Sequence, residues 1–296
     1  MQRLFGFSVL ALIMVFATGA NAHIGEKVYL IFEIPDGDLP DIEFDGDISD
    51  WENIVGPPSL IPTDFFADPT VGAGAQYDAA DMDYRIWMAW NQTGNHIYGA
   101  IDRIDNIYFN EYAGGNPGSV WQQDSIEFMV DGDHSGGSYN RNNEDLSDEE
   151  KRRHFNAQAQ KFNFTFDVPD ERWGGYPGAA AWANELPYLS AFGASTGSSP
   201  TRSVLEFFVT PFDDLVESEG DSRVSPLFSG KVIGLQIANA DRDGGTDAYQ
   251  AYHTLSGQAA TFRFADRFVD ARLVGVGGDT AVEDASWARV KAAVAH

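Results

Sequence analysis

Hydrophobic and polar residues alternate in short runs along most of this chain. In the segment 125–130, for example, Ile126, Phe128 and Val130 share one face, because successive side chains of a strand point to opposite sides. The same pattern predicts strands at residues 28–34, 84–90, 97–102, 125–130, 161–167, 203–209, 231–237 and 272–274. Many short strands with a polar outer face predict an all-β chain folded as an antiparallel β-sandwich.

Helical patterns are few. Ser147 and Glu150 have the spacing of a capping box, which predicts the start of a short charged helix. Thr280 and Glu283 repeat that spacing, and apolar residues follow at roughly helical intervals. Residues 277–296 are therefore expected to form a short amphipathic C-terminal helix, which either packs on the sandwich or docks a protein partner.

Two segments are predicted to be loop insertions between strands. Residues 131–154 are polar and charged, whereas residues 171–200 carry Trp173 and Trp182 among Gly, Ala, Ser and Pro. Aromatic residues make up 13% of the chain, and many of them lie in such Gly- and Pro-rich stretches. This distribution is typical of sheets with aromatic loops.

The N-terminus has the three parts of a secretory signal. Arg3 precedes an apolar run over residues 4–16, and Ala20 and Ala22 form a small-x-small cleavage site. The domain organisation predicted is a signal peptide over 1–22, a sandwich over 23–276 and a helix over 277–296. No later segment has the length of a membrane span. The protein is therefore expected to be exported to the periplasm or the medium.

The charge and the absence of cysteine exclude several classes of function. The formal net charge of −26 repels phosphate backbones, so nucleic acid is not an expected partner. A field of this sign suits metal cations or neutral sugars. The chain has no cysteine, which rules out thiol chemistry, thiolate zinc sites and iron–sulfur clusters.

Five motifs occur in a characteristic order. They are the D-G-x-x-x-D-W turn at 45–51, the strand pair at 87–100, the W-x-x-D-S-x-E-F segment at 121–128, the strand at 204–212, and the strand and turn at 233–245. Together they resemble the family 9 carbohydrate-binding modules, over about residues 28 to 276. The resemblance implies an immunoglobulin-like β-sandwich that binds a poly- or oligosaccharide and commonly holds structural calcium.

The resemblance also implies a set of sugar-binding residues. Trp121 matches the tryptophan that stacks on the sugar, and Glu127 matches the glutamate that accepts its hydroxyls. Lys161 occupies the position of a basic residue on the neighbouring strand, with Asn163 beside it, and Gln236 could supply an amide contact. These residue types suit a sugar, because a sugar ring presents apolar C–H faces that stack on an aromatic ring and hydroxyls that hydrogen-bond to polar groups. If 121 and 127 lie on one strand, both side chains share a face.

The sequence departs from the family at the second tryptophan of the sugar site. The region 252–268, which precedes the last strand, contains no Trp. Tyr252, Phe262 or Phe264 could substitute, or the aromatic insertion could reach across with Trp173 or Trp182. The alternative interpretation of Trp121 is an aromatic at the edge of the core. For Trp51, Trp87 and Trp90, a core position is expected.

Three loops have the spacing of calcium ligands, and the match is weakest in the D-x-D-x-S loop at 45–49. Asp131 and Asp133 lie in one D-x-D-x-S-G loop, and Asn239, Asp241 and Asp243 lie in an N-x-D-x-D-G loop. Alternate oxygen side chains before a Gly turn form the first half of a calcium loop. None of the three loops has the bidentate Glu of a complete site, and a tight turn stabilised by Asx hydrogen bonds is the alternative. Calcium is the one cofactor that the sequence suggests for the leading function.

Four functions remain open. The leading one is a non-catalytic, exported carbohydrate-binding protein. A second is a non-covalent haem-binding sandwich for electron transfer, in which Met82, Met88 or Met129 would pair with a His. A third is a structural or protein-binding sandwich that uses the C-terminal helix. The fourth is a glycoside hydrolase, which is disfavoured because Asp124 and Glu127 are expected on opposite faces of a strand.

Overall fold

The computed structural model describes residues 24–68, 76–115, 117–139, 146–168, 180–245 and 249–277. The predicted signal peptide, residues 278–296 of the predicted C-terminal helix and Trp173 lie outside this part of the chain. Within it, no helix is both long enough and apolar enough to cross a membrane.

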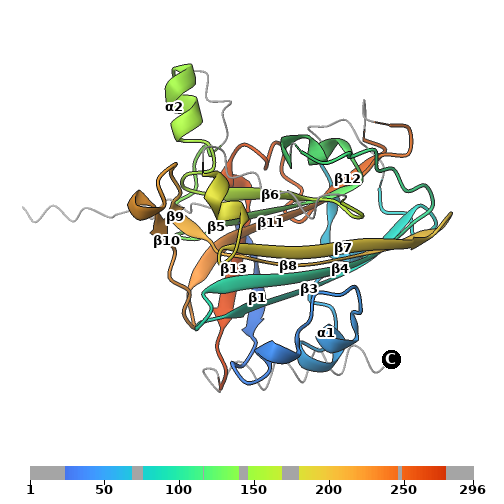
Figure 1. The fold of residues 1–296 in the computed structure, drawn as a ribbon, viewed down its shortest axis with the longest axis horizontal. Coiled ribbons are helices and arrows are strands. Elements are labelled where there is room, and N and C mark those ends of the chain that lie inside the picture. The colour runs from blue at the N-terminus through green and yellow to red at the C-terminus, as the bar shows by residue number, and fades with distance from the viewer. Residues whose placement is uncertain are drawn as a thin grey trace, which may run out of the picture.

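Strands dominate the described chain (Figure 1). They are β1 (Ile24–Glu33), β2 (Phe66–Ala67), β3 (Met82–Asn91), β4 (His96–Asp105), β5 (Ser125–Asp131), β6 (Gln160–Phe164), β7 (Leu189–Gly197), β8 (Thr201–Val209), β9 (Phe212–Asp214), β10 (Arg223–Val224), β11 (Val232–Asp241), β12 (Ala251–Thr254) and β13 (Val269–Val274). The α-helices are α1 (Ser49–Ile54) and α2 (Asp148–Arg153), and the 3-10 helices are η1 (Leu39–Asp41), η2 (Pro62–Asp64), η3 (Pro117–Gln122), η4 (Ala181–Asn184), η5 (Glu219–Asp221) and η6 (Ala265–Arg267).

The strands form two facing layers joined through β1. One layer contains β6, β5, β11 and β13, with β12 and β2 beside β11, and the other contains β3, β4, β8 and β7. Figure 1 shows β5, β6 and β11 above β7, β8 and β4. The first strand pairs parallel with β13 and, at Phe32 and Glu33, parallel with β3. The predicted β-sandwich is confirmed, but its pairing is mixed rather than purely antiparallel, because β1 lies between two strands that run in its own direction.

The core fills the space between the two layers. Ile126 and Phe128 from one layer lie in the same apolar cluster as Leu205 and Phe207 from the other. The rings of Phe128 and Phe207 have centroids 5.1 Å apart. Burial of such rings supplies most of the favourable free energy of folding.

The three tryptophans expected in the core are there. Trp51, Trp87 and Trp90 are all 0% exposed, and each indole nitrogen donates a hydrogen bond inside the protein. Met82 and Met88 lie in the main apolar cluster, and Met129 lies in a second one.

The helices agree only in part with the sequence pattern. The capping box before α2 is confirmed, since the Ser147 hydroxyl accepts from the Glu150 amide and the Glu150 side chain accepts from the Ser147 amide. The helix α1, however, was not predicted, because only Trp51 in its six residues is buried and a single buried residue gives no helical period. The strand β7 was wrongly predicted as part of a loop insertion.

Candidate functional site

The outer face of the β6–β5–β11–β12 half of the sheet carries most of the predicted sugar-binding residues. Glu127 lies opposite Asn163 on β6 and opposite Ala238 on β11, and Lys161 lies opposite Met129. Residues paired in register point to the same face of a sheet. The strands β5, β6 and β11 thus bring Glu127, Lys161 and Asn163 together, as the resemblance implies.

Glu127 is held by two neighbours on this face. The Tyr252 hydroxyl donates to its Oε2 at 2.6 Å, and Lys161 Nζ lies 2.7 Å from the same oxygen. The Glu127 side chain is 2% exposed and that of Lys161 is 13% exposed. Burial, together with the charge of Glu127, raises the pKa of Tyr252 well above its usual value, so the phenol stays a hydrogen-bond donor. Of this ion pair, Lys161 is the member that reaches solvent.

A row of rings continues from Glu127 to the surface. The rings of Tyr252 and Tyr249 have centroids 4.8 Å apart. The Arg242 guanidinium lies 3.8 Å from the centroid of Tyr249 and 5.5 Å from that of Trp121. Trp121 is 39% exposed. We call Trp121, Tyr249, Tyr252, Phe262 and the cations between them the aromatic face.

Phe262 closes the other end of this face. The ammonium of Lys161 lies 5.6 Å from the centroid of its ring, and the guanidinium of Arg263 lies 5.0 Å from it. Phe262 belongs to the segment before β13 in which the family's second tryptophan is missing, and its ring is partly exposed. Of the substitutes considered from sequence, Tyr252 and Phe262 both lie against the Glu127–Lys161 pair.

Three buried oxygens on the same face have no hydrogen-bond partner among the described residues. They are Ser125 Oγ, Asn163 Oδ1 and Thr254 Oγ1. Thr254 pairs with Ala238, so it lies in one row with Glu127 and Asn163. Buried polar atoms normally bind protein, water or a ligand. This row therefore provides buried polar atoms next to the rings that could bind water or a ligand.

The remaining sugar-site candidates have other neighbours. Gln236 Oε1 accepts from the amides of Leu255 and Ser256, so this side chain holds a turn. Trp182 packs on Tyr188 and Phe212 in a separate cluster.

Trp121 itself lies on η3 and not on β5, which begins at Ser125. The strand-parity argument for Trp121 and Glu127 was therefore wrong. The rings of Tyr249 and Tyr252, and not a shared strand, connect the two residues.

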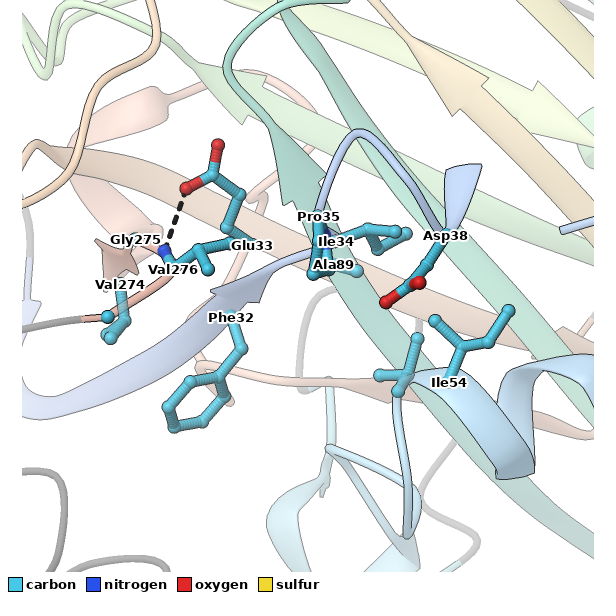
Figure 2. A pocket seen from close by; sticks show the side chains of 12 residues that line it. Phe32, Glu33, Ile34, Pro35, Asp38, Ile54, Ala89, Val274, Gly275 and Val276 are labelled. Atoms are coloured by element: carbon cyan, nitrogen blue, oxygen red, sulfur yellow. Dashed lines mark hydrogen bonds between the residues drawn. The ribbon is translucent and has the colours of Figure 1, made fainter. Parts of the chain in front are cut away.

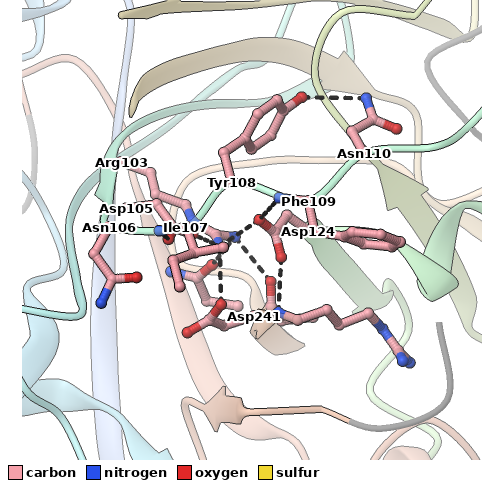
Figure 3. Close-up of polar contacts among 12 residues, drawn as sticks. Arg103, Asp105, Asn106, Ile107, Tyr108, Phe109, Asn110, Asp124 and Asp241 are labelled. Carbon is pink, nitrogen blue, oxygen red and sulfur yellow. Dashed lines mark hydrogen bonds and ion pairs between the residues drawn. The ribbon is translucent and has the colours of Figure 1, made fainter. Parts of the chain in front are cut away.

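A cluster of carboxylates lies at the end of β11, next to the aromatic face. Arg103 forms ion pairs with Asp105, Asp124 and Asp241, and its shortest contact is to Asp105 (Figure 3). All four side chains are at most 1% exposed. One buried guanidinium thus faces three buried carboxyls, which leaves excess negative charge inside the protein. Such an excess is costly in a low dielectric unless a proton or a cation neutralises it.

Asp241 is the member of this cluster whose negative charge is the most costly. Neither of its carboxylate oxygens has a hydrogen-bond partner among the residues that the structure describes. Burial raises the pKa of Asp241 to about 8, Arg103 opposes the shift, and the neighbouring aspartates add to it. Asp81 and Asp243 offer further carboxylate oxygens within 4.8 Å of it and of each other. Oxygen ligands from Asp81, Asp241 and Asp243 fit a hard divalent cation.

Other predicted calcium ligands have protein partners. Asn239 Oδ1 accepts from Arg103 at 3.2 Å. The Asp131 carboxylate accepts from the amides of Ser135 and Gly136, and Asp133 accepts from the Ser135 amide. These contacts match the tight Asx turn that was the alternative for this loop.

Comparison with known proteins gives a match in structure but none in sequence. No protein-family model matches the chain, and no curated protein does. A family 9 carbohydrate-binding module from Caldicellulosiruptor kristjanssonii, solved in complex with cellotriose, aligns with a TM-score of 0.50 at 13% identity, over 84% of this chain and 94% of that one. The chain has the fold of a family 9 carbohydrate-binding module. Two further structures match less well. A family 9 module from the same bacterium in complex with glucose has a TM-score of 0.47 at 13% identity, over 83% of this chain and 96% of that one. A Bacteroides uniformis protein described as a putative carbohydrate-binding protein has a TM-score of 0.45 at 14% identity, over 83% of this chain and 99% of that one.

A cavity of ≈ 290 Å³ lies elsewhere on this family 9 fold. It is lined by α1 and by the ends of β1 and β13, including Ile34, Pro35, Ile54 and Val276 (Figure 2). Glu33 accepts a hydrogen bond from the Val276 amide at its edge. None of its lining residues belongs to the aromatic face or to the carboxylate cluster.

The sequence patterns did not indicate several residues of the candidate site. Asp81 and Asp105 have no motif around them, and only the fold brings them to Asp241. Arg242 lies between two predicted ligands, which could have drawn attention to it, but its position over Trp121 needed the folded chain.

Proposed function

We propose that this protein is an exported, non-catalytic carbohydrate-binding protein. An oligosaccharide ring stacks on Trp121, while Lys161, oriented by Glu127, donates to its hydroxyls. Phe262 provides an apolar contact at the other end of the aromatic face, in place of the family's second tryptophan. A divalent cation braces the adjacent loop.

The exposure of Trp121 is the observation that carries this proposal. Trp51, Trp87 and Trp90 are fully buried, whereas Trp121 is 39% exposed. Its carbonyl accepts from Arg242 Nε and from the Tyr249 hydroxyl, both at 3.3 Å. An exposed flat ring on a rigid support is what stacking on the C–H face of a sugar requires.

Two observations favour binding over glycoside hydrolysis. Ile126 and Glu127 pair with Asn239 and Ala238, respectively, so they face opposite sides of β5. Asp124, just before β5, forms an ion pair with Arg103, whereas Glu127 forms one with Lys161. The two carboxyls do not share one groove, as hydrolysis of a glycosidic bond would need. The likeness in fold to modules solved with cellotriose and glucose supports the same function.

We propose that the cation that stabilises this loop is calcium, held by Asp81, Asp241 and Asp243. The support is the burial of Asp241, which makes its ionised form costly without a cation, and its two oxygens, which have no hydrogen-bond partner in the described part of the chain. Calcium is bound by six to eight oxygens, so water and the side chain of Asn106, whose Oδ1 is also buried without a partner, complete the set. Arg103 takes the place of a second cation among Asp105, Asp124 and Asp241.

Titration of the protein with glucose, cello-oligosaccharides and a panel of other soluble glycans tests the carbohydrate proposal. Intrinsic fluorescence should change with saturation, and Trp121→Ala should weaken binding about 30-fold or more, since truncating a central Trp costs about 2 kcal/mol or more. Trp51→Phe is the control, which should lower the melting temperature but leave affinity unchanged. A folded protein that gives no response to any glycan would overturn the proposal.

A further inference from the structure

Arg242 links the carboxylate cluster to the aromatic face. Its position in the sequence is between Asp241 and Asp243, two of the three proposed cation ligands. Its backbone amide donates to Asp124 Oδ1 at 2.8 Å, and its side chain reaches the aromatic face. A displacement of the 241–243 backbone would therefore move the guanidinium as well.

The Arg242 side chain holds Tyr249 and Trp121 of the aromatic face in place. Its guanidinium lies over both Tyr249 and Trp121, and its Nε donates to the Trp121 carbonyl. Arg242 is only 1% exposed, so it supports the rings from within while Trp121 faces solvent. A guanidinium stacks on aromatic faces better than an ammonium does, because it is planar.

The charges of the carboxylate cluster determine how firmly the Arg242 side chain is positioned. Without a cation, the carboxylates of Asp81, Asp241 and Asp243 lie within 4.8 Å of one another and repel. A bound cation turns that repulsion into attraction to a common centre and fixes the 241–243 backbone. The ring positions then follow through Arg242.

We propose that Arg242 is a positioning residue that couples cation binding to carbohydrate binding, so that a cation in the carboxylate cluster orders Trp121 and strengthens the grip on the sugar. The proposal rests on the carbohydrate and cation sites of the proposed function. It adds that binding at one site changes the binding free energy at the other. Coupling between sites is reciprocal, so the sugar should also tighten cation binding by the same factor.

The first test needs no sugar. Addition of Ca²⁺ to the EDTA-treated protein should change the tryptophan emission, and the change should be absent in Trp121→Phe. Arg242→Met should still bind Ca²⁺ by isothermal titration calorimetry but lose the emission change. Arg263→Met, which removes a cation from Phe262 and not from Trp121, is the matched control and should keep it.

The second test measures affinity for a cello-oligosaccharide with Ca²⁺ and with EDTA. The wild-type protein should bind about 5- to 150-fold more tightly with Ca²⁺, the usual range of coupling between sites. Arg242→Met should bind equally in both conditions, and Arg242→Lys should recover part of the difference.

The outcomes separate this coupling from the proposed function. Ca²⁺ binding without a Trp121-dependent emission change, or an emission change that Arg242→Met retains, would overturn the coupling, and so would the absence of Ca²⁺ binding. A normal emission change with no binding of any sugar would support the link from the cation through Arg242 to Trp121, but it would overturn the carbohydrate function and, with it, the coupling to sugar binding.

Discussion

Glu206 on β8 illustrates how a single buried carboxyl organises a distant turn. Its Oε1 accepts from the Trp51 indole at 2.8 Å, and its Oε2 accepts from the amides of Asp45 and Gly46. These hydrogen bonds favour the ionised form, but burial outweighs them and raises the pKa of Glu206 to about 7. The D-G-x-x-x-D-W turn is thus attached to the sheet through a group that titrates near neutral pH.

The stability of the protein should respond to this titration. The folded pKa of Glu206 is above the ordinary glutamate pKa of 4.5, so the folded state binds more protons between pH 4.5 and 7. The contribution of Glu206 is fully present below pH 4.5 and is lost as pH rises through 7. Glu206→Gln cannot titrate and should lack this loss, so the difference between its melting temperature and that of the wild type should shift by a few degrees in favour of the variant as pH rises from 5 to 8.

Melting curves over that pH range check the prediction, with the exposed Glu217→Gln as the matched control. Parallel profiles for the wild type and Glu206→Gln would contradict it.

Gly99 on β4 shows how closely the two neighbouring strands approach. A Cβ at this position would overlap the ring of Phe207, whereas a Cβ at Gly37 would meet nothing within 4 Å. Gly99→Ala should destabilise the protein by about 1–3 kcal/mol, because the ring must shift within a packed core. Gly37→Ala should be close to neutral. Denaturant unfolding measures both, and equal midpoints would show that the core yields at this site.

At the scale of elements, β7 depends on a contact between the layers. Asp167, just after β6, accepts from the Ser195 amide at 2.8 Å and from the Ser195 hydroxyl. The Asp167 amide donates in turn to the Gly193 carbonyl. Because β7 is the last strand of its layer, only one of its edges is paired by another strand.

Removing this carboxylate should loosen the β7 edge without unfolding the sandwich. Asp167 has φ 51°, so Asp167→Gly removes the side chain and keeps a backbone that tolerates this angle. Hydrogen exchange at Ser195 and its neighbours should then speed up, while the amides of β4 should remain protected. Glu185→Ala, an exposed change just before β7, is the control. Unchanged exchange in β7 after Asp167→Gly would show that β8 alone holds the strand.

At the scale of the whole molecule, negative charge opposes folding. The chain has 45 acidic residues against 19 Lys and Arg, and part of this excess is buried around Asp241. Self-repulsion of this kind destabilises the compact state and is screened by salt. A cation bound at one site stabilises the folded chain further, by mass action.

Calcium should therefore raise the melting temperature beyond the effect of salt. At a Ca²⁺ concentration 100 times its Kd, binding adds about 2.7 kcal/mol to the free energy of unfolding. Asp243→Asn should remove most of this gain, whereas Asp133→Asn, in the loop of Asx turns, should retain it. Thermal melts in EDTA, Ca²⁺ and NaCl of matched ionic strength give the answer. A gain that NaCl reproduces would argue against a specific site.

The sequence by itself determined most strands and the core, because both depend on local alternation. Ile126, Phe128 and Val130 are buried as the pattern requires, and the capping box of Ser147 needs only its next three residues. The order of short motifs was enough to indicate a family 9 fold.

Tertiary structure decided what depends on contacts distant in sequence. The parallel pairing of β1 joins residues near 30 to those near 270, and no local pattern encodes it. Asp81 and Asp105 become possible cation ligands only because β3 begins, and β4 ends, near Asp241 at the end of β11. Arg242 supports Trp121 across 121 residues of chain. Alternation sets which face a side chain takes, but only the packing of the layers sets which other side chains it meets there.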